Sequence, residues 1–150
     1  MEKQSLIPFE GKPMTDEWKN RGVKEGQEYA ILTSEIAQAT FGLTPKEHKV
    51  LKNLEKQNLR DHMTPLELIF TALGEEITRN IAVADDAQGF EKNRDSALQG
   101  GKLAGDARER VEKDKRVKVV SAQNFLNQIE DAEKQGVLPE SENLQSTLFS

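Results

Sequence analysis

The sequence predicts an all-α fold, a small irregular helical domain with loose tails at both ends. Two capping boxes are the first observation, because Thr44-Pro45-Lys46-Glu47 and Thr64-Pro65-Leu66-Glu67 each place Thr at a helix cap and Glu three residues later. The second is that apolar residues recur at the three- and four-residue spacing of helices. The third is the lack of segments that alternate apolar and polar residues, as half-buried strands do.

The composition describes a chain with a small core and no cysteine chemistry. Its aromatic residues are six Phe, one Tyr and one Trp, and 31% of its 150 residues are charged. Without cysteine, disulfides and thiolate metal sites are excluded, which suits a reducing cytoplasm. No apolar segment reaches the length of a membrane span, and the N-terminus has no apolar targeting segment. We therefore expect a soluble cytoplasmic protein.

The two ends of the chain differ in composition from its middle. Residues 1–14 contain two prolines, a glycine and few apolar side chains, which predicts a loose N-terminal arm. Residues 15–135 carry the helical pattern and are expected to form one domain. Residues 136–150 are expected to be a disordered acidic tail, since residues 121–150 carry five acidic side chains and one basic one. The net charge of −5 is therefore mostly a property of the C-terminus.

The first two helices are delimited mainly by glycines. Residues 15–18 open a short helical turn, and we expect Trp18 to anchor it on the core before two glycines break it. Residues 29–32 are either a brief extended segment or the start of the second helix. That helix has a suitable cap at Thr33 and can end at Gly42, since glycine favours the left-handed conformation that follows many helices.

The capping boxes start the third and fourth helices. The third is expected to run from Pro45 to about Gln57. Its buried face would consist of Val50, Leu51 and Leu54. The fourth begins at Pro65, and the apolar stripe that we expect to face the core consists of Leu66, Ile69, Phe70, Leu73 and Ile77. Gly74 within this helix predicts close packing or a bend, because an interior glycine costs about 1 kcal/mol relative to alanine.

Residues 85–110 remain compatible with a helix although several glycines interrupt them. A row of small residues consists of Ala97, Gly101, Ala104 and Gly105. Another helix could approach closely along this row, or the glycines could make the segment flexible. Residues 117–120 are extended by propensity. Ser121 can cap a last helix that continues to about residue 132.

No sequence pattern points to a catalytic, cofactor or metal site. The glycine-rich segment 100–105 has lysine where a dinucleotide-binding fingerprint needs its second glycine, and no strand precedes it. Asp61 and His62 with Glu67 could form an acid–base pair, or they could simply complete the turn before the fourth helix. His48 and His62 do not form the i, i+4 pair of a helical zinc site. We expect no enzymatic activity, no cofactor and no bound metal.

A nucleic-acid interface is an alternative suggested by spacing. Residues 34–41, a three-residue link and residues 45–57 resemble a helix-turn-helix. Four basic residues lie along the second of these helices at mostly threefold spacing, and a fifth follows it: Lys46, Lys49, Lys52 and Lys56, then Arg60. Such a stripe could contact phosphates, or it could be the solvated face of an ordinary amphipathic helix.

Several short motifs of the chain point to one family. They are Thr15-Asp16-Glu17-Trp18-Lys19, Arg21-Gly22-Val23-Lys24-Glu25-Gly26, Tyr29-Ala30-Ile31-Leu32-Thr33, Ala39-Thr40-Phe41-Gly42, Asn58-Leu59-Arg60-Asp61-His62-Met63-Thr64, Asp86-Ala87-Gln88-Gly89-Phe90 and Val119-Val120-Ser121. With them, residues 15–126 resemble the C-terminal region of prophage antirepressors of the BRO family and of the related DNA-damage-inducible protein D group. The resemblance assigns no role to Arg60, Asp61, His62, Met63, Gln88, Gly89 and Phe90.

Residues 5–13 are similar to the opening of the BRO N-terminal domain, the part usually credited with DNA binding, but the body of that domain is missing. The resemblance therefore implies a non-enzymatic regulatory module of the phage or SOS damage response. Its partner would be a repressor or a DNA-repair or recombination protein, with self-association also open. We expect at most weak DNA binding, with a Kd of roughly 10⁻⁴ to 10⁻⁶ M. The reason is that the acidic C-terminal segment would repel a phosphate backbone.

Overall fold

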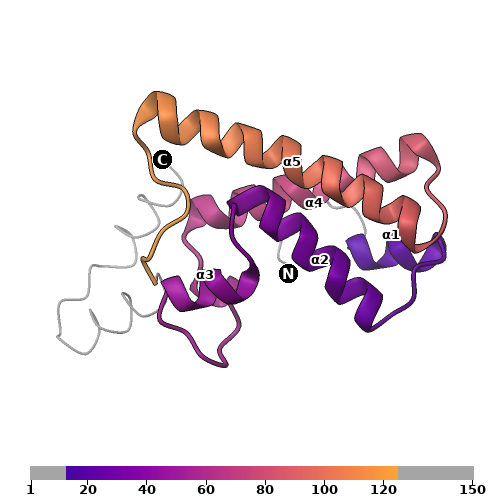
Figure 1. Cartoon of the computed structure of the whole chain (residues 1–150), viewed down its shortest axis with the longest axis horizontal. Coiled ribbons are helices and arrows are strands. Elements are labelled where there is room, and N and C mark those ends of the chain that lie inside the picture. Colours follow the sequence, from indigo (N-terminus) through magenta and orange to yellow (C-terminus); the bar gives the residue numbers. More distant parts are fainter. Residues whose placement is uncertain (1–12, 125–150) are drawn as a thin grey trace, which may run out of the picture.

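The computed structural model describes residues 13–124, which form five α-helices and one 3₁₀ helix. In chain order these are α1 (Met14–Asn20), α2 (Gln27–Phe41), α3 (Pro45–Leu51), η1 (Arg60–His62), α4 (Pro65–Asp85) and α5 (Gly89–Lys115). No strand occurs within residues 13–124, so the prediction of an all-α fold is confirmed. The long helix α5 packs on both α2 and α4, while α1 and α3 lie at opposite ends of this three-helix centre (Figure 1).

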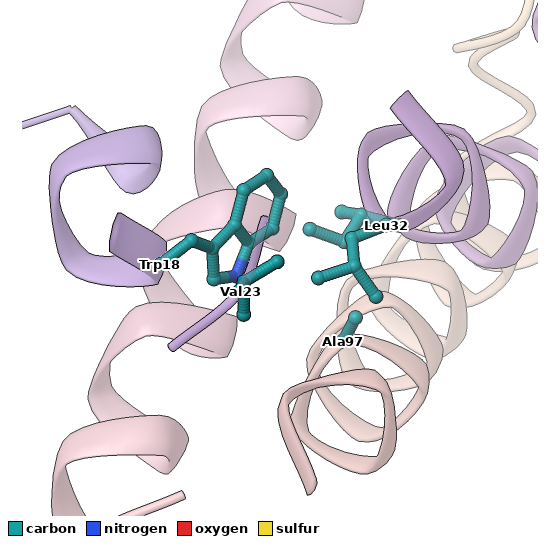
Figure 2. Packing of buried hydrophobic residues seen from close by; sticks show 5 residues of the cluster. Trp18, Val23, Leu32 and Ala97 are labelled. Atoms are coloured by element: carbon teal, nitrogen blue, oxygen red, sulfur yellow. The ribbon is translucent and has the colours of Figure 1, made fainter. Parts of the chain in front are cut away.

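Helix α1 is anchored by Trp18, as the sequence predicts. The indole is buried between α1, α2 and α5, where it packs with Val23, Leu32 and Ala97 (Figure 2). The chain then leaves α1 through Arg21, whose carbonyl oxygen accepts a hydrogen bond from the N–H of Gly89 at 2.7 Å. The start of the domain is therefore fixed to the turn between α4 and α5.

Helix α2 is longer than its cap signal indicates. It begins at Gln27, so Thr33 lies inside it and is no cap, and residues 29–32 are helical rather than extended. The earlier start buries Leu32 against the core around the indole. The predicted end is confirmed: Gly42 follows the helix in the left-handed conformation with φ of 80°, and its N–H donates to the carbonyl of Gln38.

Both capping boxes are formed, but α3 ends early. In each box the Thr hydroxyl accepts the N–H of the Glu three residues on, and the Glu carboxylate accepts the N–H of the Thr. The predicted end of α3 near Gln57 is wrong, because Asn53 adopts a left-handed φ of 61° and the chain turns after Leu51. Leu54 folds back and is buried as expected. Val50 and Leu51 were expected to be buried but remain 70% and 42% exposed.

Small residues on α5 allow α2 and α4 to approach it very closely. Helix α5 is continuous over 27 residues, so its glycines do not interrupt it. A methyl group added at Gly100 would lie 2.1 Å from the hydroxyl oxygen of Thr78 on α4, and one added at Gly105 would lie 2.2 Å from the carbonyl oxygen of Ala39 on α2. The close approach suggested by the row of small residues is thereby confirmed.

This close packing also decides which side of α4 is buried. The side that meets α2 and α5 carries small and polar residues, among them Thr71, Gly74 and Thr78. Gly74 has no room for a methyl group beside Thr40, so close packing rather than a bend explains it. The predicted stripe is rotated from the buried side: Phe70 is buried, whereas Ile69 is 61% exposed. Treating the whole stripe as the core face is therefore wrong.

After α5 the chain turns back toward α3 as an irregular segment that we call the strap, residues 117–124 (Figure 1). The turn is made at Arg116, which has a left-handed φ of 58°. Val119 and Val120 are buried, but no strand forms. Residues 122–124 are not helical, so the last helix does not begin at Ser121. The rest of that prediction, most of the N-terminal arm and the acidic tail lie outside the described residues.

Replacing Gly100 by Ala will test the close helix contact. The added methyl group meets the backbone N of Thr78 at 2.6 Å, which cannot move without displacing α4. We expect Gly100→Ala to lower the free energy of unfolding by about 1–3 kcal/mol, although alanine is intrinsically the better helix former. The neighbouring exposed substitution Gln99→Ala is the control, and both are measured by urea denaturation. A Gly100→Ala protein as stable as the control would contradict the packing.

Candidate functional site

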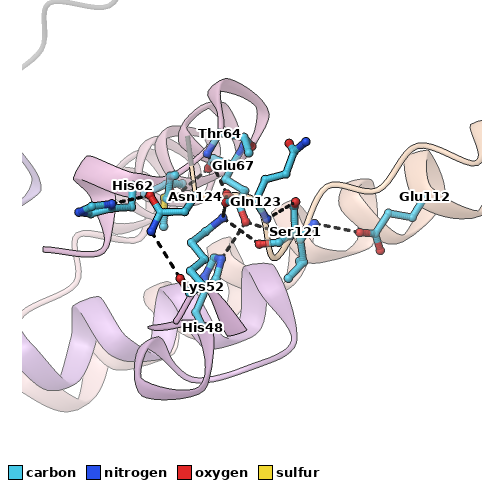
Figure 3. Close-up of polar contacts among 12 residues, drawn as sticks. His48, Lys52, His62, Thr64, Glu67, Glu112, Ser121, Gln123 and Asn124 are labelled. Carbon is cyan, nitrogen blue, oxygen red and sulfur yellow. Dashed lines mark hydrogen bonds and ion pairs between the residues drawn. The ribbon is translucent and has the colours of Figure 1, made fainter. Parts of the chain in front are cut away.

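The carboxylate of Glu67 is fully buried at the start of α4, where it bonds to three other segments of the chain (Figure 3). Its Oε1 accepts the N–H of Thr64 at 2.9 Å and lies 2.6 Å from Nζ of Lys52. Its Oε2 lies 2.8 Å from Nε2 of His48 and accepts the N–H of Ser121 at 3.1 Å. One side chain thus joins α3, the cap of α4 and the strap.

Local sequence explains how these groups meet. The capping box fixes Glu67 at the third position of α4, with its carboxylate turned back toward the helix start. His48 and Lys52 are four residues apart at the end of α3, so both side chains leave the same side of that helix. The imidazole of His48 also packs edge-on against Phe41, with ring centroids 5.1 Å apart. The ion pair is therefore formed inside an apolar surrounding.

Hydrogen bonds keep the buried carboxylate ionised. Burial alone would raise the pKa of Glu67, because a charge is poorly solvated away from water. Hydrogen bonds from His48, Lys52, the Thr64 N–H and the Ser121 N–H outweigh this effect, and they hold the pKa of Glu67 below its ordinary value. Glu67 is thus a charged structural hub that is closed to solvent.

The strap is held mainly through its main chain. Oε2 of Glu112 on α5 accepts the N–H groups of Val119 and Val120 at 3.0 and 3.1 Å. Nζ of Lys52 donates to the carbonyl of Ser121 at 2.8 Å and to that of Gln123 (Figure 3). The carboxylates of Glu112 and Glu67 and the ammonium group of Lys52 therefore bind five polar groups of the strap backbone, which are three N–H groups and two carbonyls.

The basic residues of the predicted stripe differ in exposure and in their partners. Lys52 is not an exposed member of the stripe, because its side chain is fully buried against Glu67. Lys46 and Lys56 are exposed and Lys49 is half-buried. Arg60 pairs with Glu75 on α4. The helix-turn-helix resemblance is limited to the link, since the second helix has only seven residues.

The predicted acid–base pair is not formed either. Asp61 is exposed, and Nδ1 of His62 lies 2.6 Å from the side-chain oxygen of Asn124 in the strap. Neither residue contacts Glu67 through its side chain, which pairs instead with His48. These residues complete the turn before α4 and its contact with the strap, as the simpler interpretation held.

The seven residues to which the sequence resemblance assigns no role form two groups at opposite ends of α4. Arg60, Asp61, His62 and Met63 lie at its start, where Met63 is buried with Phe70 and the strap valines. At its other end the Gln88 side chain donates to Asp86. There Gly89 has φ of 83° and Phe90 packs on the cluster around Trp18. Both groups fix chain reversals.

Sequence reasoning missed His48, Lys52 and Glu112 as partners of the buried network. His48 and Lys52 stand among exposed lysines, so their local pattern is that of a solvated face. Their partners are distant in sequence: Ser121 is 54 residues from Glu67 and 69 from Lys52. The one signal in the sequence is the i, i+4 spacing of His48 and Lys52, which places both side chains on the same side of a helix.

A second surface feature is the outer apolar face of α4, which we define as Leu68, Ile69 and Leu73. These side chains are 41%, 61% and 37% exposed. At about 100° per residue, Ile69 points directly away from the buried side formed by Thr71, Gly74 and Thr78. The first two turns of α4 therefore present large apolar side chains outward on a rigid helix.

Replacing Glu67 by Gln will test the hub. We expect a loss of about 3–5 kcal/mol at neutral pH, because Lys52 is left buried without its counter-charge. The folded pKa of Glu67 is depressed, so this contribution is complete above about pH 4.3, the ordinary Glu value, and is lost as the pH falls through the lower folded value. The measurement is urea denaturation between pH 3 and pH 7.

The matched control is Glu47→Gln, which alters the exposed capping box of α3. It should cost less than about 1 kcal/mol, as usual for a cap at the surface. A Glu67→Gln loss that stays constant down to pH 3 would contradict the assigned network.

Comparisons with protein families, with characterised proteins and with solved structures found no match to this chain. Within residues 13–124, no group of three His, Cys, Asp or Glu side chains could hold a metal ion. None of the described helices is long and apolar enough to cross a membrane. A proposal about function therefore depends on the surfaces and contacts of the chain and on the motifs of its sequence.

Proposed function

We propose that this chain is a non-enzymatic regulatory module, antirepressor-like, which acts in the bacterial cytoplasm by binding another protein during a phage or DNA-damage response. The observation that carries the proposal is the outer apolar face of α4. Leu68, Ile69 and Leu73 are adjacent, exposed and apolar, and contiguous exposed apolar groups are typical of protein-binding surfaces.

The rigidity of α4 favours this use. The helix has 21 residues, begins at a complete capping box and packs along α5. Its outer side chains therefore stand on a helix that is already folded before a partner binds. A preorganised helix face loses little conformational entropy on binding. The sequence motifs shared with BRO-type antirepressors support the regulatory part of the proposal and the choice of a repressor or a repair or recombination protein as partner.

A charge placed in the outer apolar face should abolish partner capture. We expect immobilised full-length chain to retain a specific protein from a lysate of prophage-carrying, DNA-damaged bacteria, and Ile69→Glu to reduce that protein at least tenfold. The reason is that an unpaired carboxylate would be desolvated at the interface. Quantitative mass spectrometry of the retained proteins is the measurement.

Leu103→Glu is the matched control, because Leu103 is also apolar and 52% exposed but lies on α5 rather than on α4. It should capture the same protein as the unmodified chain. Capture that survives Ile69→Glu and Leu73→Glu together, in proteins with unchanged thermal unfolding, would refute the role of this face.

Nucleic-acid binding is the second candidate. Its supporting observation is that Lys46, Lys49 and Lys56 have no ion-pair partner among the described residues. Lysines that are free of internal partners can neutralise phosphates and release counterions. Three such side chains around a seven-residue helix favour weak, sequence-independent contact.

Replacing these three lysines by alanine should weaken a binding that is already weak. We expect Kd of roughly 10⁻⁴ to 10⁻⁶ M at physiological salt for the unmodified chain, with affinity falling as salt rises. Lys52 is left intact in this test, because its removal would strand the Glu67 charge. Lys102→Ala on α5 is the control, and a gel-shift titration is the measurement. Sub-micromolar, sequence-dependent binding that the triple substitution abolishes would replace the first proposal by this one.

A further inference from the structure

The strap is an irregular segment with bends at residues 119, 120 and 122, and its main chain is bound directly by side chains of the helical body. Three consecutive N–H groups of its main chain, at Val119, Val120 and Ser121, are accepted by carboxylates of the helical body. Two carbonyls, at Ser121 and Gln123, accept from Lys52. Where a protein binds a peptide through its main chain, the main-chain hydrogen bonds supply affinity and the side-chain pockets supply specificity.

The two valines supply the side-chain part of this recognition. Val119 is fully buried and Val120 nearly so, in a cluster with Phe41, Met63 and Phe70. We call the surface that receives the strap the strap site. It consists of Phe41, Met63, Phe70, Lys52, Glu67 and Glu112. All six belong to α2–α5 and the connections between them, so the site is built without the strap itself.

The connection between the strap and α5 is suited to release. Arg116, Val117 and Lys118 are exposed. No side-chain bond of these three residues to another described residue is found, and Arg116 adopts a left-handed φ of 58°. Firm contacts begin only at Val119. A tethered ligand of this kind has an effective concentration in the millimolar range, which a free competitor must exceed.

We propose that the strap site is a peptide-binding site, occupied here by the chain's own strap. A segment of a partner protein that has two consecutive β-branched residues and adopts the same bent backbone can take the place of the strap. This inference deepens the proposed function and rests on its premise that the partner is a protein. The chemistry favours a segment without acidic side chains, since an anionic ligand would meet the carboxylates of Glu67 and Glu112.

The test uses the full-length chain and a dye-labelled peptide with the sequence of residues 118–124. In one variant, Val119→Asp and Val120→Asp weaken the strap but leave the site unchanged. We expect this variant to bind the peptide at least tenfold more tightly than the unmodified chain, measured by fluorescence anisotropy. A peptide carrying the same two substitutions should not bind. Adding Glu112→Leu to the weakened chain should reduce affinity at least tenfold, because two N–H acceptors are lost.

Two outcomes would overturn the proposal. One is a weakened chain that keeps its helical circular dichroism and does not bind the peptide. The other is a weakened chain that loses its cooperative fold, since the strap would then be part of the core and no exchangeable ligand.

A measurement on the unmodified chain is independent of these variants. Amides of residues 119–121 should exchange with solvent at least a hundredfold faster than buried amides in the middle of α5, because the strap opens while the helices stay folded. Equal protection would also overturn the proposal. Failure of the proposed function is recognised separately: the Ile69→Glu comparison can fail while the peptide still binds to the strap site.

Discussion

The distance at which α5 lies from α2 and α4 determines much else in this domain. Gly100 and Gly105 leave no room for even a methyl group, so helix backbones and short side chains meet directly. Residues that face such a contact must be small, which explains why α4 buries Thr71, Gly74 and Thr78. Its large apolar residues are then left to the remaining sides. The exposure of Ile69 therefore follows from the packing of α5, and it is no accident of a poorly filled core.

Where the helices cannot pack so closely, the domain uses a buried ionic network. Removing a carboxylate and an ammonium group from water costs several kcal/mol for each, which only good geometry and further hydrogen bonds can offset. Glu67 meets that condition with four partners on its two oxygens. Such a network contributes little net stability compared with apolar packing, but it tolerates few alternative arrangements. It therefore specifies how α3, α4 and the strap are joined.

Local signals in the sequence predicted the local features correctly. The two capping boxes, the end of α2 at Gly42 and the anchoring by Trp18 each depend on a few adjacent residues. The end of α3 was mispredicted because the helical spacing of Val50, Leu51 and Leu54 gives no sign that Asn53 reverses the chain between them. The buried face of α4 was mispredicted because apolar spacing alone cannot show that a neighbouring helix will demand small residues.

The candidate site was harder to predict, because its bonds join segments far apart in the sequence. Glu67 was recognised as a capping residue, which accounts for only one of its four partners. The burial of Lys52 depends on the early end of α3 and on carbonyls of the strap, and neither is encoded nearby. The resemblance to known sequence motifs marked residues at both ends of α4 without assigning them a role.

The position of the strap has a consequence for the order in which the protein can assemble during its synthesis. Residues 48–67 leave the ribosome well before the strap, since Ser121 follows Glu67 by 54 residues. At about 5–20 residues per second, several seconds separate the two. During that interval Glu67 and Lys52 lack the backbone groups of the strap that bind them in the finished fold, so this end of the domain can close only after nearly the whole described chain has emerged. The cluster around Trp18 can form after less of the chain has been synthesised, because its partner Ala97 precedes the strap.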